Sequence, residues 1–345
     1  MLLPREVGWR RVHLLSPEAL GLLDALRRPR RPPPGLSAER LASWVLDGIL
    51  EIEHAGSMQC GPATHPLFFP ARPPAGPGDL PSRLSREALR YAGSLGRSDP
   101  LTLTDRLYRY NSQPASPAWR RSFGDSPSVA RLLQTDRKGR ALKARRGKDA
   151  VLESPGGRGV WRVWEGSGGR SPEPGAPTFK LYLSPALEAV GEALPALLAL
   201  FETRAGPFSA KVGRDLTNLL RPDKLVAYFS RRADLFAAAT RLHRRLAGLP
   251  AQGVPFTTAF DPQGLLSWAA DPPDDGEPPG PHRRSSWRGW ITARLGAALA
   301  SALATGVPVP PWQYALDRVS LDGVDPARWT RPEWCGPLEP PDADN

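Results

Sequence analysis

The sequence predicts an α+β protein in which a helical N-terminal half packs on a small antiparallel sheet with flanking helices. Two observations lead to this expectation. Apolar residues recur at helical spacing through the first half of the chain, whereas short segments that alternate apolar and polar residues follow a Gly- and Pro-rich tract in the second half. The elements there run strand, helix, strand, strand, helix, an order that suits an antiparallel sheet.

Three helices are expected in the first half. Ser37 is the expected N-cap of the first helix, and Ser85 and Thr104 are the expected N-caps of the second and third. Each cap precedes apolar residues at helical spacing, which most often form a core. We therefore assign residues 35–135 to the helical part of one large domain.

The domain itself is expected to span residues 35–310. A basic loop is expected over 136–178, because lysine and arginine crowd its first part and Gly and Pro its last part. The α+β part follows over 179–310. An N-terminal segment, 1–34, precedes the domain, and an irregular tail rich in tryptophan, 311–345, follows it.

The second half places lysine on one face of its strands. Lys180 and Tyr182 alternate with apolar residues, and so does Lys211, so these polar side chains lie opposite the apolar ones. The expected strands are Phe179–Ser184, Phe208–Val212, Lys224–Phe229, Gly253–Thr257 and Gly264–Trp268. Helices are expected over 185–201, over 235–246 and over 289–304.

Composition narrows the classes of function. The formal net charge of +11 indicates an anionic partner: nucleic acid, a phosphopeptide or an acidic peptide. Without a zinc-finger, helix-turn-helix or RNA-binding signature, nucleic acid is not the expected partner. Cys60 and Cys335 stand far apart and the histidines lack metal-ligand spacing, so we expect no metal and no cofactor. The absence of a signal peptide and of an unbroken apolar stretch predicts a cytoplasmic protein with no membrane partner.

Three lysines stand in or beside apolar segments, namely Lys180, Lys211 and Lys224, in a chain whose basic residues are mostly arginine. Arginine keeps its proton in proteins, whereas a partly buried lysine can become a neutral amine that accepts a proton. These lysines are therefore candidates for catalysis. The alternative is that they are solvated residues of strand edges.

A family resemblance comes from six segments in order. They are Phe179–Pro185, Phe208–Asp215, Leu220–Phe229, Gly253–Thr257, Gly264–Pro272 and Ser286–Arg294. Their succession resembles the HopA-type effector domain over residues 35–310. Its most specific parts are Lys211, the Arg221/Asp223 pair, the Pro-Phe-Thr turn and the Asp-Pro that closes the Gly264 strand. Homologues of that domain serve as lyases in class V lanthipeptide and thioamitide biosynthesis.

A more distant similarity is to bacterial effector phosphothreonine lyases. Those enzymes have a Lys-x-His-x-Ser strand whose histidine is the presumed general acid. Here the matching strand offers Lys180 and, in place of the histidine, Tyr182. Three alternatives are therefore open: Tyr182 takes the acid role, Lys180 takes it, or the catalytic plan differs from that of those enzymes.

These resemblances imply a lyase that eliminates phosphate from phosphoserine or phosphothreonine in a ribosomally made precursor peptide, giving dehydroalanine or dehydrobutyrine. A partner kinase would supply the phosphorylated peptide. Lys211 is the expected base, with Lys180 or Tyr182 as the acid. The expected phosphate ligands are Arg221, Arg214 and Lys224. Two alternatives remain: a leader-peptide or partner-kinase binding subunit without catalysis, and a secreted effector that acts on host phosphoproteins.

Overall fold

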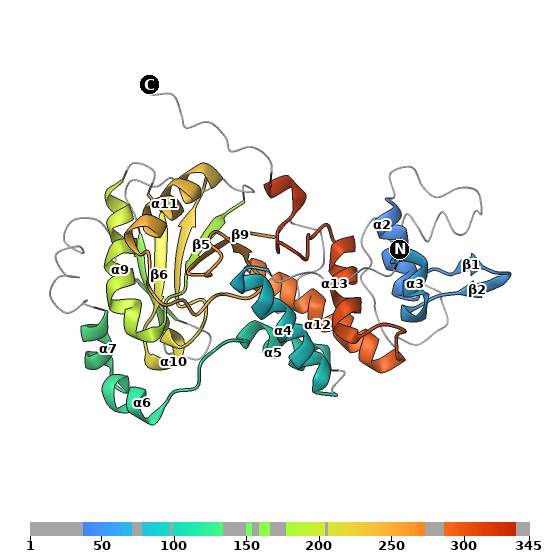
Figure 1. Ribbon diagram of the computed structural model, residues 1–345, viewed down its shortest axis with the longest axis horizontal. Coiled ribbons are helices and arrows are strands. Elements are labelled where there is room, and N and C mark those ends of the chain that lie inside the picture. The colour runs from blue at the N-terminus through green and yellow to red at the C-terminus, as the bar shows by residue number, and fades with distance from the viewer. Residues whose placement is uncertain are drawn as a thin grey trace, which may run out of the picture.

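The computed structural model describes residues 37–70, 78–96, 99–133, 150–153, 159–165, 177–203, 206–272 and 286–335. These residues form a mixed α+β fold, which confirms the predicted class. The central sheet lies on one side of the molecule with α9 and α11, and the remaining larger helices gather on its other side (Figure 1). The expected N-terminal segment, 1–34, lies outside the described residues.

The central sheet has seven strands in the order β3-β4-β6-β7-β5-β9-β8, and every neighbouring pair is antiparallel. The strands are β3 (Ala150–Glu153), β4 (Gly159–Glu165), β5 (Phe179–Leu183), β6 (Ser209–Gly213), β7 (Leu225–Phe229), β8 (Thr258–Ala259) and β9 (Leu266–Ala270). The expected strand at Gly253–Thr257 is absent from this sheet. There Phe256 has a φ of 61°, which breaks an extended backbone, and its N–H donates to Ser85 Oγ at 2.7 Å.

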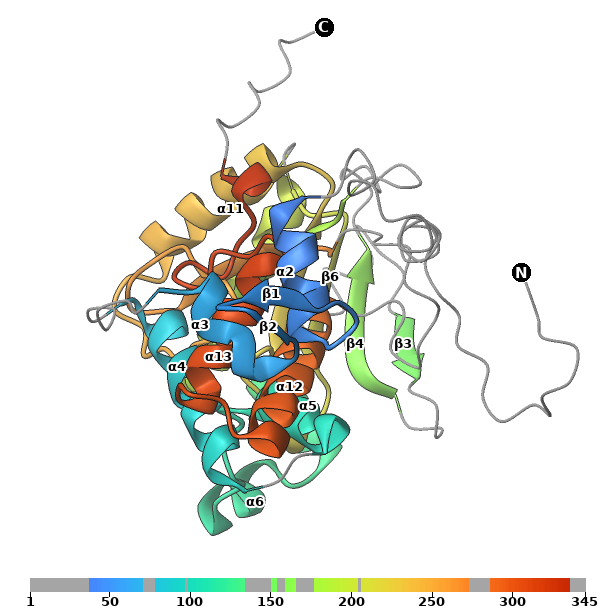
Figure 2. The same ribbon diagram turned by 90° about the vertical axis from the view of Figure 1, so that its right-hand side faces the viewer.

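Two strands correct the basic loop expected over 136–178. Within that stretch β3 and β4 form a hairpin, and β4 pairs with β6 at one side of the sheet (Figure 2). The segment Gly159–Glu165 alternates as a strand should, with Val163 on one face and Trp164 buried on the other. The neighbouring Gly and Pro residues hide this alternation in the sequence. Residues 136–149, 154–158 and 166–176 lie outside the described part of the chain.

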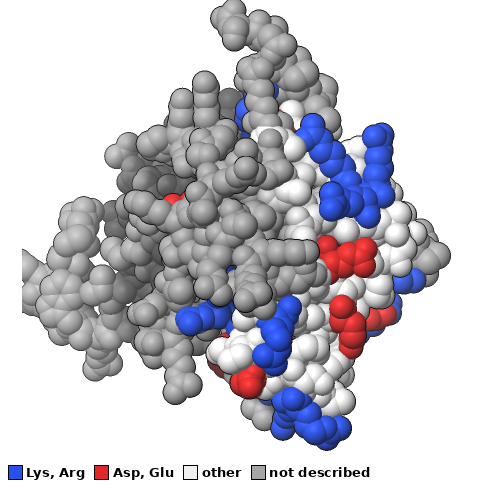
Figure 3. All heavy atoms as spheres, turned by 90° about the vertical axis from the view of Figure 1, so that its left-hand side faces the viewer, with Lys and Arg blue, Asp and Glu red and all other residues white. Residues whose placement is uncertain are grey.

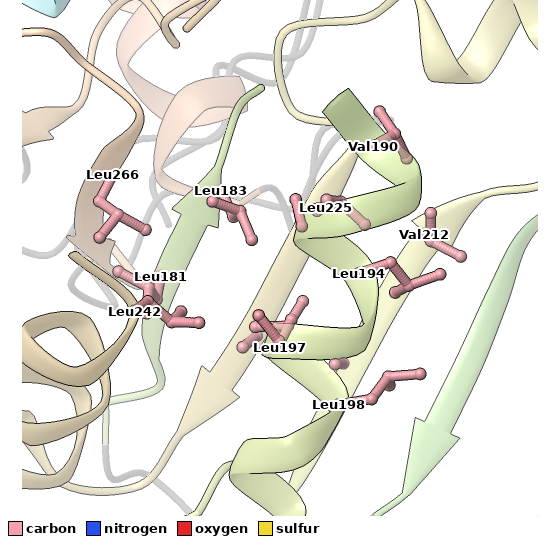
Figure 4. Packing of buried hydrophobic residues seen from close by; sticks show 14 of the residues in the cluster. Leu181, Leu183, Val190, Leu194, Leu197, Leu198, Val212, Leu225, Leu242 and Leu266 are labelled. Atoms are coloured by element: carbon pink, nitrogen blue, oxygen red, sulfur yellow. The ribbon is translucent and has the colours of Figure 1, made fainter. Parts of the chain in front are cut away.

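The apolar face of the sheet is covered by α9 (Val190–Ala199) and α11 (Arg232–Arg245). Leucine and valine side chains from the strands and from these helices meet in one core cluster (Figure 4). Its members on the strands include Leu181, Leu183, Val212, Leu225 and Leu266, and we call this side the apolar face. Antiparallel pairing fixes the polar residues between them on the opposite side.

The remaining α-helices are α2 (Ala38–Leu46), α3 (His65–Phe68), α4 (Leu80–Ser94), α5 (Pro100–Arg109), α6 (Pro117–Phe123), α7 (Ser126–Leu132), α10 (Leu216–Leu219), α12 (Trp287–Thr305) and α13 (Pro311–Leu321). A small hairpin, β1 (Ile52–His54) and β2 (Ser57–Gln59), projects from this helical side (Figure 1). Short 3-10 turns lie at Pro62–Thr64, Leu187–Ala189, Leu200–Glu202 and Pro332–Trp334. No described helix combines the length and hydropathy needed to cross a membrane.

The helix caps agree with the sequence only in part. Ser37 caps α2 as expected, since its Oγ accepts from Arg40 N–H at 3.2 Å. The next two helices begin earlier than expected, with Asp79 and Asp99 as their caps. A proline follows each aspartate within the first turn, which is a favoured helix start.

The expected irregular tail, 311–345, begins instead with the regular helix α13. This helix packs on α12, and it buries Tyr314, Ala315 and Val319. Of the two aromatic residues of α13, Tyr314 is buried and Trp312 is partly buried. Residues 336–345 lie outside the described chain.

Candidate active site on the polar face of the sheet

Lysine and tyrosine side chains share the face of the sheet opposite α9 and α11. On β5 and β7, Lys180 is paired with Tyr228, and on β6 Lys211 pairs with Val226, which in turn pairs with Tyr182. Tyr182 and Val226 pack in the second core cluster with residues of α5 and α12. We call this side the polar face, defined by Lys180, Tyr182, Lys211, Tyr228 and Trp161 of β4. The part around Tyr182 packs against α5 and α12.

Tyr228 stands between the two lysines. The centroid of its ring lies 5.8 Å from Lys180 Nζ and 5.7 Å from Lys211 Nζ. Burial raises the pKa of the Tyr228 phenol, although Lys180 opposes the shift. Tyr228 is therefore a phenol with its proton at neutral pH, next to two amines.

Lys211 differs from the other cations of the site. Burial lowers its pKa, and this effect outweighs the attraction of Asp223, which favours the charged form. Among the described residues, its amine makes no hydrogen bond and no ion pair. Its nearest aromatic neighbour is Trp161, with Nζ 4.4 Å from the ring centroid. Lys211 as a whole residue is half-buried, and its amine combines a lowered pKa with the absence of an ion-pair partner among the described residues.

Asp223 holds two arginines at the end of the polar face. Arg221 donates from Nε and Nη2 to the two carboxylate oxygens, both at 2.9 Å, and Arg288 of α12 places Nη1 2.9 Å from Oδ2. Burial alone would raise the pKa of Asp223, but the arginines hold it well below its usual range. Asp223 therefore stays ionised and fixes both guanidinium groups.

Arg288 is almost completely buried and makes contacts in several directions. It donates from Nη2 to the Tyr108 carbonyl at 2.7 Å and from Nε to the Pro255 carbonyl at 3.2 Å. Nη1 is an ion-pair partner of Asp223 by distance, yet its N–H groups are not aligned for a hydrogen bond with any described residue. A buried N–H donor without an acceptor carries a free-energy cost that an anionic ligand would remove.

Aromatic rings flank the arginines. The Arg221 guanidinium carbon lies 5.6 Å from the ring centroid of Tyr108 and 5.1 Å from that of Trp161, and Arg221 also donates to the Tyr108 hydroxyl at 3.3 Å. Arg288 lies 4.8 Å from the Tyr108 ring. These contacts orient the planar guanidinium groups.

The expected acid candidates have different surroundings. Lys180 forms an ion pair with Asp271, which follows β9 and remains partly exposed. Tyr182 is 3% exposed, and burial raises its pKa well above the usual value. Tyr182 thus lies in the core cluster. The Lys180 amine, by contrast, lies 5.8 Å from the ring centroid of Tyr228.

Two expected phosphate ligands lie apart from these contacts. Lys224 is completely buried, and its amine donates to the Pro185 carbonyl at 2.6 Å and to Gln252 Oε1. Burial lowers its pKa to about 7. Arg214 is exposed in the turn between β6 and α10. The structure gathers Lys180, Lys211 and Arg221, but it directs the Lys224 amine to structural oxygens.

Five residues of the site were not among the sequence candidates: Tyr108, Trp161, Tyr228, Asp271 and Arg288. Trp161 has a sequence signal, namely the alternation of Gly159–Glu165. Tyr228 lies within the expected strand Lys224–Phe229, and Asp271 belongs to the Asp-Pro that closes the Gly264 strand. No local pattern marks Tyr108 of α5 or Arg288 of α12. Among the described residues, no group of histidine, cysteine or acidic residues is arranged to hold a metal ion.

Charge is mixed on the face that Figure 3 shows. There the described lysine and arginine side chains are interspersed with acidic ones. The positive charge of the described residues in this view is thus not collected over one area. The cations on the polar face, by contrast, converge on one set of aromatic and acidic partners.

Comparison with known proteins adds little beyond this geometry. No protein-family model matches the chain, and no curated protein matches it either. Two solved structures of effector proteins, from Pseudomonas syringae pv. tomato strain DC3000 and pv. syringae strain 61, are similar to it. Each is 14% identical and covers 72% of this chain, with 97% and 98% of the effector chains matched and TM-scores of 0.46 and 0.42. Any function must therefore be argued from the side chains of the polar face.

Proposed function

We propose that the polar face is the active site of a lyase that eliminates phosphate from phosphoserine or phosphothreonine in a ribosomally made precursor peptide. The product is dehydroalanine or dehydrobutyrine. The observation that carries the proposal is Lys211, a half-buried lysine whose amine has a lowered pKa and no ion-pair partner among the described residues, and whose charge is opposed by two nearby arginines, Arg221 and Arg288. The sequence resemblance to the HopA-type effector domain supports the same reaction.

The reaction needs a base at the substrate Cα. The neutral Lys211 amine takes the Cα proton, and the electron pair of that C–H bond forms the Cα=Cβ double bond. The Cβ–O bond breaks, and its electron pair leaves on the phosphate oxygen. A lowered pKa raises the fraction of neutral amine at neutral pH, which is what this step requires of a lysine.

The arginines supply the anion site. Asp223 uses Nε and Nη2 of Arg221, so Nη1 remains for a ligand, and the Nη1 donors of Arg288 have no aligned acceptor among the described residues. Two guanidinium groups on one carboxylate leave a net charge of about +1, which attracts a phosphate dianion. Guanidinium groups bind phosphate through parallel, charge-assisted hydrogen bonds.

The acid that helps the phosphate leave is then Tyr228 or Lys180. Tyr228 lies between the Lys180 and Lys211 amines and keeps its proton because burial raises its pKa. Lys180 is oriented by Asp271. Tyr182 lies deeper, within the core cluster, so its burial argues against a direct proton transfer to substrate.

The partners follow from the substrate. A phosphorylated peptide requires a kinase, so we propose a kinase as the enzyme that acts before this one. The test is to incubate the protein with phosphoserine and phosphothreonine peptides in excess chelator. We expect mass spectrometry to show that the peptide loses the elements of phosphoric acid. When a thiol is then supplied, we expect it to add to the alkene of the product.

The same assay separates the alternatives. Recovery of unmodified serine or threonine with free phosphate would mean a phosphatase and would end the lyase proposal. Binding of the phosphopeptide without turnover would favour the recognition subunit, and turnover of folded phosphoproteins but not of short peptides would favour the effector. The control is Arg244→Met, which removes one exposed positive charge from α11, on the other side of the sheet.

A further inference from the structure

Trp161 contacts both halves of the candidate site. Its ring centroid lies 4.4 Å from Lys211 Nζ and 5.1 Å from the guanidinium carbon of Arg221. One half-buried indole therefore lies beside the expected base and beside the expected phosphate ligand. Among the described aromatic rings, only Trp161 makes cation–π contacts with both of these groups. Tyr228 contacts Lys211 but not Arg221, and Tyr108 contacts Arg221 but not Lys211.

The strand register explains how the indole reaches Lys211. On β4 and β6, Val163 pairs with Lys211 and Trp161 pairs with Gly213, so Trp161 and Lys211 are diagonal neighbours on one face. Gly213 has no side chain to occupy the position directly across from the indole. A side chain is also excluded there, because a Cβ would lie 2.7 Å from the Asn218 carbonyl carbon. The pairing thus leaves the indole beside Lys211 without a competing cross-strand side chain.

The ring acts on the amine in two opposed ways. Its π face attracts the ammonium form and so raises the pKa of Lys211. Its bulk excludes water and so lowers that pKa. The other groups that face Lys211 are Asp223 and Arg221 before β7, Tyr228 on β7, Tyr108 on α5 and Arg288 on α12.

We propose that Trp161 is a positioning residue that holds the Lys211 amine beside Arg221, with its ring against the ammonium group and its bulk between that group and water. The proposal rests on the proposed function in that Lys211 is taken to be the base. Because the two effects differ in sign, the π face and the bulk of the indole are separable by substitution.

The expected shifts are opposite for two variants. Trp161→Leu keeps an apolar cover but removes the π face, so the Lys211 pKa falls, by roughly 0.4 to 1.5 units. Trp161→Ala removes the cover as well, so water reaches the amine and the pKa rises toward that of a solvated lysine. Trp161→Phe keeps both an aromatic ring and an apolar cover, so the pKa of Lys211 stays close to its wild-type value.

Two readouts test this in the full-length protein. The first is the pH dependence of Lys211 acetylation by acetic anhydride, followed by mass spectrometry of the peptide that contains it, which needs no turnover. The second is the pH–rate profile of phosphopeptide elimination, whose rising limb should move with the labelling pKa. Trp164→Leu on the opposite face of β4 is the control, since it loosens the strand without contact to Lys211.

The outcomes separate this inference from the proposed function. If Trp161→Leu lowers the labelling pKa and Trp161→Phe restores it, but no variant eliminates phosphate, Trp161 positions the amine and the lyase proposal fails. The opposite result is also informative. If the wild type eliminates phosphate, and Trp161→Leu and Trp161→Phe have the same Lys211 pKa by acetylation and the same pH–rate profile as the wild type, the lyase proposal stands and the Trp161 inference is wrong. A shift of equal size in Trp164→Leu would also overturn it, because the effect would then come from the strand.

Discussion

The two faces of the seven-stranded sheet bury their side chains by different chemistry. On the apolar face, leucine and valine residues of the strands pack against α9 and α11 without polar atoms. On the polar face, lysine, tyrosine and tryptophan lie beneath α5 and α12 together with two arginines and an aspartate. The first arrangement gains roughly 1.5–3 kcal/mol for each large aliphatic side chain that is fully buried. On the polar face, ion pairs and hydrogen bonds must compensate the free-energy cost of removing the charged groups from water.

That difference separates Lys211 from the other cations of the polar face. Arg221 and Arg288 share Asp223, and Lys180 has Asp271. Lys211 lacks such a partner among the described residues, and its pKa falls as a consequence of burial. A residue selected for stability alone would be apolar at this position, as its neighbours on the other face are.

The largest expected effect is on chemistry. Lys211→Met keeps an unbranched apolar stem and removes the amine, so elimination should slow by about 10² to 10⁴-fold, the usual contribution of a general base. Phosphopeptide affinity should stay within a few-fold of the wild type. Stability should be unchanged or higher, because a desolvated amine is lost. Single-turnover kinetics and titration calorimetry measure the rate and the affinity, and elimination at the wild-type rate would show that another group is the base.

The next effect is on stability. Asp223→Asn leaves the Arg221 and Arg288 charges without their carboxylate in a buried place, so the free energy of unfolding should fall by about 3–5 kcal/mol. Leu197→Ala on α9 should cost a similar amount, about 2–5 kcal/mol, through a cavity. Urea denaturation compares the two. A cost below about 1 kcal/mol for Asp223→Asn would mean that the arginines find other partners.

A smaller effect is expected on binding. Arg221→Met removes a charge-assisted contact to phosphate, so affinity for a phosphopeptide should weaken by about 1.5–3 kcal/mol for each hydrogen bond lost, while affinity for the unphosphorylated peptide stays the same. Arg214→Met tests the other expected arginine, which is exposed and should have a lesser effect. If both variants lose the same amount of phosphopeptide affinity, the phosphate binds near the turn after β6, where Arg214 lies, as well as near Arg221.

The smallest effect concerns pH. Burial lowers the pKa of Lys224 to about 7, so between that pH and the ordinary lysine pKa the unfolded chain binds a proton that the folded chain does not. The free energy of unfolding should therefore rise with pH across this window, by at most about 1.4 kcal/mol for each pH unit from this residue. In Lys224→Met that part of the slope should vanish. A wild-type slope that persists in the variant would assign it to other groups.

Much of the site was visible in local patterns. Alternation in Phe179–Ser184 and around Lys211 correctly separates the polar side chains from the apolar ones, because side chains in a strand alternate between faces wherever the strand lies. The cap at Ser37 is local in the same sense, since it joins residues three apart in sequence. The predicted roles of Lys211 and Arg221 also came from the sequence, through its resemblance to a family, and they remain predictions.

The sequence by itself thus determined the α+β class and the face on which Lys180, Tyr182 and Lys211 lie, since both follow from the short-range geometry of the backbone. Only the tertiary structure decided that α12 brings Arg288 to Asp223, that α5 adds Tyr108, and that Trp161 covers the Lys211 amine. It also decided that Lys224, one residue from Asp223, turns its amine to Pro185 and Gln252. Those contacts join residues far apart in the chain. Their geometry depends on how helices pack across the sheet, which no local pattern of residues encodes.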